Sequence, residues 1–430
     1  MAMRSMATVG VVCAAFFIAG VGCSSGHGSS PGSGDDPWGG HGAGGAGAPT
    51  GTATGGTGGA GSGGAAGAGV AGASGQSPVG CSIPTAPPDT WVEILAPSGL
   101  SNFDVTDVFA AGTNDLLFAG YSADPTDPTS LSSERIVRWT HGCWSVDLAI
   151  PPSADASGSP SVHGTGPDDI WATTGDVIYH RDAQGWTPFT NDSWRAVAHP
   201  LQPPTATLVF NRVRAAAAND FWIAATSNVL HWDGAAWTAY NFDDATLPLS
   251  GVAYQFGDIW IDSPSQVWVV GSGKMVGNMM SAGFIHGFDG ASWTHTGVGV
   301  GFIYPAIWRG GTELWLAMDT HAYLKGQSMN QASQHTTLLD FDGTEAWAVE
   351  FSGLAPAQGL PAMYSVFGHG ASDMWAAGSD VAHFDGQAWS VIPDAPAPVS
   401  ASTNTLVTGD EGSVWLVTPG PRFFRKATSP

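Results

Sequence analysis

The sequence has few charged residues and few cysteines for its length. Only 11% of its 430 residues are charged, and 36 acidic residues outnumber 13 Lys and Arg, which gives a formal net charge of -23. A surface this acidic repels phosphate groups, so we expect no nucleic-acid partner and no basic membrane-binding patch. The four cysteines are too few for a disulfide-scaffolded fold, and they lack the clustered spacing of a zinc site.

The motifs of common enzyme classes are also missing. The sequence contains no nucleophile elbow, phosphate-binding Walker loop, His-Glu-x-x-His motif or dinucleotide fingerprint. We therefore expect no metal and no cofactor. A polysaccharide lyase or glycosidase that assembles its Asp, Glu, His and Tyr from separate repeats would leave no such motif, so an enzyme stays open. Glycine and tryptophan are abundant instead, with 60 and 19 residues.

The first 22 residues have the form of an export signal. One positive charge, Arg4, precedes an uncharged apolar run over residues 7–22 that is too short to span a bilayer comfortably. The run ends in Gly20-Val21-Gly22-Cys23, which resembles the lipobox of bacterial lipoproteins, although Gly20 stands where that motif usually has Leu. The resemblance implies that Cys23 is diacylated and becomes the mature N-terminus. The alternative is an ordinary signal with a free or paired Cys23.

Residues 23–80 predict a lipidated cysteine followed by a disordered tether. This Gly/Ala/Ser-rich stretch holds one aromatic residue, Trp38, and cannot bury enough apolar surface to offset the entropy of ordering it. A flexible coil of this length has a reach of roughly 40 Å. We expect a domain over residues 81–430 to be held off an outer membrane or cell surface, with secretion as the alternative.

Residues 81–430 repeat a tryptophan-containing strand that follows a turn residue. Six copies keep the tryptophan: Asp169-Ile170-Trp171, Asp220-Phe221-Trp222, Gln266-Val267-Trp268, Glu313-Leu314-Trp315, Asp373-Met374-Trp375 and Ser413-Val414-Trp415. The first copy is expected to have Phe118 in the tryptophan place. A second signature follows, as in residues 231–237, where Asp233-Gly234 separates two aromatic runs. Asp-Gly between such runs indicates a hairpin, so each unit predicts four short strands.

The ends of the repeat predict a closed ring. Tryptophans of the second signature occur at positions 91, 144, 186, 237, 293, 347 and 389, so the first precedes the first full unit. The last unit stops near Phe423-Phe424 and lacks a strand with a tryptophan of the second signature. An all-β, seven-bladed β-propeller of four-stranded antiparallel blades explains both ends, with the N-terminal strand completing the last blade. A β-sandwich or a helical repeat is the competing fold, and the absence of long 3.6-period segments disfavours helices.

The pattern Asp-x-Trp-Ala-x-Gly followed by His-x-Asp-Gly-x-x-Trp resembles the tryptophan-rich propeller repeats of secreted bacterial lipoproteins. The resemblance covers residues 91 to about 426 and implies a fold rather than an activity. In WD-type propellers, similar histidines join a hydrogen-bond network within each blade. We prefer this interpretation to a metal site, because one histidine per blade lies on a wide ring; the residues are His180, His231, His286 and His383.

Cys81 and Cys143 lie near the strands that finish the last and first blades. These blades are neighbours in a closed ring, so we predict a disulfide between the two cysteines; the alternative is two unpaired thiols.

A candidate ligand site lies on the first strands, which line the channel of a propeller. His163, Arg214, Trp260 and Trp308 occupy equivalent places there, together with Phe367. Stacking and charge-assisted hydrogen bonds from these residues suit a sugar or an acidic group, and interblade packing is the alternative role. Long loops fall almost wholly on one face, which we expect to carry binding. One of them, with Asp124 and Asp127, offers oxygens for Ca²⁺ without a defined ligand spacing.

The sequence thus favours a monomeric, non-enzymatic, envelope-anchored propeller that binds a protein or a glycan through its loop-rich face. A glycan-active enzyme on that face is one alternative. A lectin with one shallow sugar site per blade is the other.

Overall fold

The computed structural model describes 16 stretches of the chain, all between residues 81 and 428. They are residues 81–85, 87–123, 131–150, 159–198, 208–226, 228–242, 252–275, 281–300, 306–310, 313–320, 336–341, 346–349, 351–352, 363–396, 406–410 and 412–428. The predicted signal, Cys23 and the tether lie outside them, as do Asp124, Asp127 and most of the long loops.

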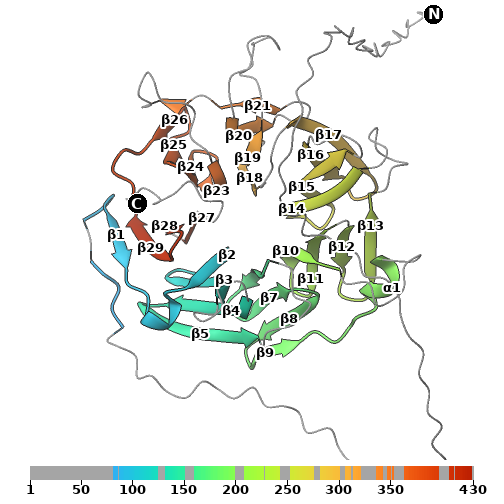
Figure 1. Ribbon diagram of the computed structural model, residues 1–430, viewed down its shortest axis with the longest axis horizontal. Coiled ribbons are helices and arrows are strands. Elements are labelled where there is room, and N and C mark those ends of the chain that lie inside the picture. Colours follow the sequence, from blue (N-terminus) through green and yellow to red (C-terminus); the bar gives the residue numbers. More distant parts are fainter. Residues whose placement is uncertain are drawn as a thin grey trace, which may run out of the picture. The chain divides into compact units, whose positions relative to one another are not determined.

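Seven antiparallel sheets lie around a ring (Figure 1), as the repeat predicts. Blade 1 contains β2 (Phe103–Gly112), β3 (Asp115–Ala123), β4 (Leu131–Thr140) and β5 (Cys143–Ile150). Blade 2 contains β6 (Ser161–Gly166), β7 (Asp169–Thr174), β8 (Val177–Asp182) and β9 (Gly185–Pro188). Blade 3 contains β10 (Phe210–Ala217), β11 (Asp220–Ala225), β12 (Asn228–Trp232) and β13 (Trp237–Asn241).

The remaining blades follow the same order from the inside outward. Blade 4 contains β14 (Val252–Ser263), β15 (Gln266–Met275), β16 (Ser281–Phe288) and β17 (Trp293–Val300), and blade 5 contains β18 (Ala306–Gly310), β19 (Glu313–Thr320), β20 (Thr336–Phe341) and β21 (Ala346–Ala348). Blade 6 contains β23 (Met363–Gly370), β24 (Asp373–Gly378), β25 (Val381–Phe384) and β26 (Trp389–Val391), and a short parallel strand, β22 (Phe351–Ser352), extends its edge. The helices α1 (Trp194–Ala198) and η1 (Ser98–Leu100) are short.

Blade 7 joins the two ends of the ring. It contains β27 (Leu406–Asp410), β28 (Ser413–Thr418) and β29 (Arg422–Ala427), and its outer strand is β1 (Trp91–Ile94). β1 pairs antiparallel with β29, with Trp91 opposite Lys426 and Ile94 opposite Phe423. The predicted seven-bladed fold is confirmed, including its closure by the N-terminal strand.

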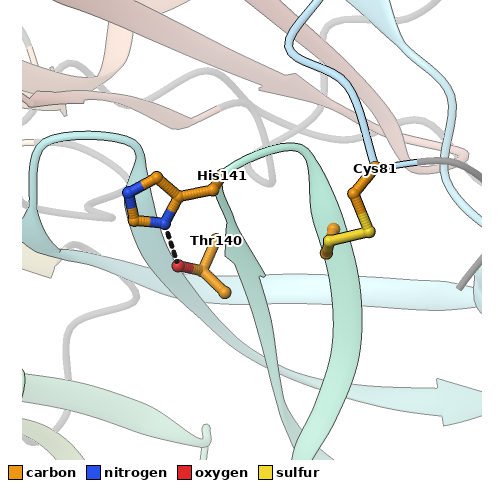
Figure 2. Close-up of a disulfide and its surroundings, with 4 residues drawn as sticks. Cys81, Thr140 and His141 are labelled. Carbon is orange, nitrogen blue, oxygen red and sulfur yellow. Dashed lines mark hydrogen bonds between the residues drawn. A yellow bond between two sulfur atoms is a disulfide. The ribbon is translucent and has the colours of Figure 1, made fainter.

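A disulfide joins Cys81, just before β1, to Cys143 at the start of β5, with the two Cα atoms 4.8 Å apart (Figure 2). It therefore links blade 7 to blade 1, the neighbours predicted from the sequence. The adjacent turn requires glycine, because Gly142 has φ +88° and a Cβ there would lie 2.6 Å from the carbonyl carbon of Ser82. The disulfide thus joins blade 7 to blade 1, beside the β1–β29 pairing that completes blade 7.

A Trp-His-Asp arrangement recurs in the middle of the blades. In blade 2, the rings of Trp171 and His180 stack with centroids 4.0 Å apart, and His180 Nε2 lies 2.8 Å from Asp169 Oδ1. Blades 3 and 6 repeat this arrangement, with His231–Asp220 at 2.9 Å and His383–Asp373 at 2.8 Å. The predicted role in a network within each blade is thus confirmed for these three histidines.

His286 departs from this arrangement. In blade 4, Gln266 stands where blades 2, 3 and 6 have the carboxylate, and His286 is 1% exposed among the rings of Phe242, Phe284 and His295. Burial and the neighbouring His295 lower the pKa of His286 to about 3.

The expectation that Phe118 takes the tryptophan place of the first unit is wrong by one residue. Leu117 packs toward the next blade, blade 2, just as Trp171 of blade 2 packs toward blade 3. Leu117 also lies opposite Phe109 of β2. Phe118 faces the other way and contacts Phe423 of blade 7, with ring centroids 5.1 Å apart. Successive strand residues point to opposite faces, so an aromatic residue one position later enters a different interblade core.

Candidate functional site

One position on each inner strand lies opposite the repeated tryptophan, and we call it the ring position. The strand pairing places His163 opposite Trp171, Arg214 opposite Trp222, Trp260 opposite Trp268, Trp308 opposite Trp315, Phe367 opposite Trp375 and Thr408 opposite Trp415, with Phe109 opposite Leu117. All seven line one central cavity of about 620 Å³. The four candidate residues of the sequence analysis, His163, Arg214, Trp260 and Trp308, therefore meet in one place.

The cavity reaches toward the end of the channel where the inner strands begin. Ser159, which precedes β6, contributes to its lining, as do the cross-strand neighbours Gln255 and Ser272 of blade 4. Inner strands are entered from the interblade connections, so this is the face that the sequence predicts to be loop-rich. The loops themselves lie mostly outside the described residues.

The seven ring positions differ in chemistry around the channel. Blades 4, 5 and 6 present three consecutive aromatic residues, Trp260, Trp308 and Phe367. The preceding blades 2 and 3 present His163 and Arg214, so Arg214 is next to Trp260 along the ring, and blades 1 and 7 present Phe109 and Thr408. The cavity thus has an aromatic wall and a polar wall, which seven identical repeats would not produce.

The ring-position side chains also pack against the next blade. His163 Nδ1 accepts a hydrogen bond from the backbone N–H of Ala215 in blade 3 at 3.1 Å. Three aromatic rings lie over a glycine of the following blade, where a Cβ would approach to 3.1, 2.6 and 2.6 Å: Phe109 over Gly164, Trp308 over Gly368 and Phe367 over Gly409. Interblade packing is therefore one role of these residues, and only their remaining surface faces the cavity.

Arg214 is held between two carboxylates from different blades. Its Nη1 lies 2.9 Å from Asp107 Oδ2 of blade 1, and its Nη2 lies 2.8 Å from Asp258 Oδ1 of blade 4. Blade 2 contributes the Ser161 hydroxyl, which donates to Asp107 Oδ2 at 2.5 Å, and Arg212 Nε lies 3.9 Å from Asp258 Oδ1. A network of two arginines and two carboxylates thus crosses four blades at the cavity wall.

A polar side chain two residues before the ring position accepts a backbone hydrogen bond from the next blade. We call this contact the interblade latch. The backbone N–H groups donate to these side-chain oxygens at 3.0 to 3.2 Å: Val162 to Asp107, Val213 to Ser161, Ile307 to Asp258 and Val407 to Ser365. Arg212 of blade 3 has no acceptor, and Ala306 and Leu406 of blades 5 and 7 have no polar side chain. The acidic residues of the channel thus have a structural role that spacing along the sequence did not reveal.

The charges in this network shift the pKa values of its members. Burial raises the pKa of Asp107, but Arg214 and Arg212 outweigh it and hold that pKa below its usual range. Burial raises the pKa of Asp258, because its arginine neighbours offset the burial only in part. Burial and the charge of Arg214 lower the pKa of His163 to about 3, so His163 is neutral at physiological pH.

Within the described stretches, no group of three or more His, Cys, Asp or Glu side chains is arranged to hold a metal ion. In the same part of the chain, none of the helices combines the length and hydrophobicity needed to cross a membrane. The Ca²⁺ prediction for Asp124 and Asp127 falls outside the described residues. The described side chains at the cavity provide hydrogen-bonding groups, aromatic rings and a charge-balanced ion-pair network.

No protein-family model and no curated protein matches the chain. Among solved structures, the chain is similar to the WD40 domain of Pan2 from Neurospora crassa, with a TM-score of 0.50 at 9% identity over 80% of this chain and 98% of that chain. The β-propeller domain of the Trilobed protease from Pyrococcus furiosus gives a TM-score of 0.44 at 10% identity, covering 75% of this chain and 95% of that one. A chain of the Mitotic Checkpoint Complex gives 0.45 at 9% identity, covering 81% and 97%. At such low identity, the likeness to the Pan2 domain shows the fold alone: this chain has a β-propeller fold.

Proposed function

We propose that the chain is a non-enzymatic binding module, tethered to the cell envelope, that takes a protein or glycan ligand at the opening of its central cavity. The observation that carries this proposal is the engagement of both cavity carboxylates. Asp107 and Asp258 bind Arg214 and backbone amides, so neither is presented to a substrate as acid or base.

A glycan-active enzyme needs two carboxyl groups that contact the reacting bond. The raised pKa of Asp258 is a feature that a general acid requires. Its Oδ1, however, accepts hydrogen bonds from Arg214 and the Ile259 amide, and its Oδ2 accepts one from the Ile307 amide. A carboxyl group with both oxygens occupied in this way is better suited to joining blades than to donating a proton.

The envelope location rests on the N-terminal sequence. The apolar run over residues 7–22 directs export, and Cys23 carries the lipid that anchors the mature chain to an outer membrane or cell surface. Residues 24–80 then hold the propeller away from the membrane. The ligand therefore comes from the envelope or from outside it, and the chain acts as a monomer without a cofactor.

Two measurements test this proposal on the complete chain in a bacterial host. Radiolabelled palmitate should enter the wild-type chain and not the Cys23→Ser variant; equal labelling of both would contradict lipidation. The purified chain is then screened against a glycan array and a peptide library, with mass spectrometry to detect products. Ligand retained without new products supports a binding module, whereas a cleaved glycan would show that the chain is an enzyme.

A further inference from the structure

The central cavity has the features of a site for a neutral sugar, an inference that rests on the proposed binding function. We propose that a neutral glycosyl residue enters the cavity with one flat C–H face against the indole ring of Trp260, which Trp308 supports edge to face. Its hydroxyl groups then point toward His163, Asn211 and Arg214. The site is single and central, rather than repeated once per blade.

The aromatic wall is rigid before any ligand arrives. The rings of Trp260 and Trp308 lie edge to face with centroids 5.7 Å apart, and the indole N–H of Trp260 donates to Asp262 Oδ1 at 2.9 Å. Trp308 packs over Gly368 of the next blade. Fixed rings lose little conformational freedom on binding, and their electron-rich faces attract the C–H groups of a pyranose ring.

The polar wall carries both hydrogen-bond donors and an acceptor. Because Nδ1 of His163 accepts the Ala215 N–H, the neutral ring carries its proton on Nε2. Asn211 donates through Nδ2 to Phe256 O at 2.8 Å, which leaves Oδ1 as an acceptor toward the cavity that it lines. Arg214 uses Nη1 and Nη2 in its bonds to Asp107, Val213 and Asp258, and its Nε–H is a further donor. Hydroxyl groups both donate and accept, so they match this mixed set.

The charges of the polar wall select against an acidic ligand. Arg212 and Arg214 are balanced by Asp107 and Asp258, so the formal charge of the network is zero. A ligand carboxylate that approached Arg214 would also approach the carboxylates of Asp107 and Asp258 and meet repulsion from both. The network likewise has no excess negative charge for a cation, and a wholly apolar ligand would leave its donors without partners.

The size of the cavity limits what can enter. Its volume of about 620 Å³ falls within the range of roughly 300–1,000 Å³ that is typical of small-molecule sites. A folded protein can contact only the rim of such a cavity, whereas the end of a glycan chain fits inside. Size and balanced charge together favour the terminal sugar of a neutral glycan over a protein surface.

Calorimetric titration of the complete chain tests this inference. The probes are neutral tetrasaccharides of glucose, mannose, galactose and N-acetylglucosamine, a galacturonate tetrasaccharide, and a random decapeptide mixture. We expect binding of at least one neutral tetrasaccharide and weaker or no binding of the galacturonate. Trp260→Leu should weaken that binding roughly tenfold. Trp186→Leu, a matched change on the outer strand β9, should leave it unchanged.

A second measurement on the wild-type chain avoids any dependence on variant folding. Saturation of aromatic protons by NMR should transfer most strongly to the C–H protons on one face of one terminal sugar. Equal transfer along the whole tetrasaccharide, tighter binding of galacturonate, or a folded Trp260→Leu variant with unchanged affinity would each overturn the sugar assignment. Peptides that bind and are weakened by Trp260→Leu, with no sugar bound, would overturn it while leaving the proposed binding function intact. If no sugar and no peptide binds, the proposed function fails as well.

Discussion

Oδ2 of Asp107 in blade 1 lies 2.9 Å from Nη1 of Arg214 in blade 3, although one whole blade separates them along the chain. The Ser161 hydroxyl of the intervening blade also bonds to Asp107 Oδ2, and Asp258 of blade 4 takes the other side of the guanidinium. Side chains at the channel therefore join blades 1 to 4 from within. The β1–β29 pairing closes the ring elsewhere, within blade 7.

Removing Asp107 should destabilise the propeller strongly. The Asp107→Ala variant leaves Arg214 with one carboxylate fewer in a buried site and removes the acceptor of the Val162 amide. We expect the free energy of unfolding to fall by about 3–5 kcal/mol, measured by urea denaturation. Asp394→Ala, a change at an exposed position, is the control and should unfold at the wild-type midpoint. Equal midpoints for both variants would contradict a stabilising role for the network.

Adding an interblade latch should stabilise the ring. Ser161 and Ser365 accept the next blade's amide, whereas Ala306 of blade 5 offers no acceptor to Val366 of blade 6. Ala306→Ser should raise the free energy of unfolding by about 1 kcal/mol. The reciprocal change, Ser365→Ala, should lower it by about 1–3 kcal/mol, because it leaves the buried Val407 amide unpaired. If Ala306→Ser and Ser365→Ala changed the free energy of unfolding in the same direction, the stabilising role of the interblade latch would be contradicted.

Acid should destabilise the fold through its buried neutral histidines. The pKa of His286 is about 3 in the folded chain, against an ordinary value of 6.5, and that of His163 is lowered in the same way. The unfolded chain therefore binds more protons below about pH 6.5, and stability that is complete above that pH is lost as pH falls. Each such histidine contributes a slope of about 1.4 kcal/mol per pH unit. Urea denaturation between about pH 8 and about pH 5 should show that the free energy of unfolding depends less steeply on pH in His286→Phe than in the wild type. Equal pH dependence in both proteins would contradict a lowered pKa for His286.

Breaking the disulfide should loosen the junction of blades 1 and 7. In the chain-entropy account, constraining 62 residues stabilises the fold by about 4 kcal/mol. The double variant Cys81→Ser, Cys143→Ser should lose that amount in thermal or urea unfolding. Added dithiothreitol should lower the stability of the wild type and leave the double variant unchanged. A reductant effect of the same size on both proteins would show that the stabilisation comes from elsewhere.

The ring was predictable because its signals are local. Each Asp-Gly turn and each repeated tryptophan specifies a hairpin, and the unmatched elements around Trp91 and Phe423 specify the closure and, with it, neighbouring blades for Cys81 and Cys143. The position of Phe118 was missed because Leu117 and Phe118 are both large and apolar, so only the strand register distinguishes them.

The channel network was not predictable from spacing. Asp107, Arg214 and Asp258 are separated by whole blades, and nothing along the chain indicates that they meet. A usable signal was nonetheless present: a polar residue recurs two places before the ring position, as in Ser161 and Ser365. His163 and Trp308 were placed together because equivalent positions on the inner strands of a propeller line one channel. Their role in binding remains a prediction.

The stoichiometry of binding distinguishes one central site from one site per blade. A neutral tetrasaccharide that binds in the wild-type titration is followed to saturation on the complete chain by calorimetry. We predict one bound tetrasaccharide per chain, with that single site weakened in Trp260→Leu. Several equivalent sites per chain that persist in Trp260→Leu would instead place recognition on the repeated blades and contradict a central site.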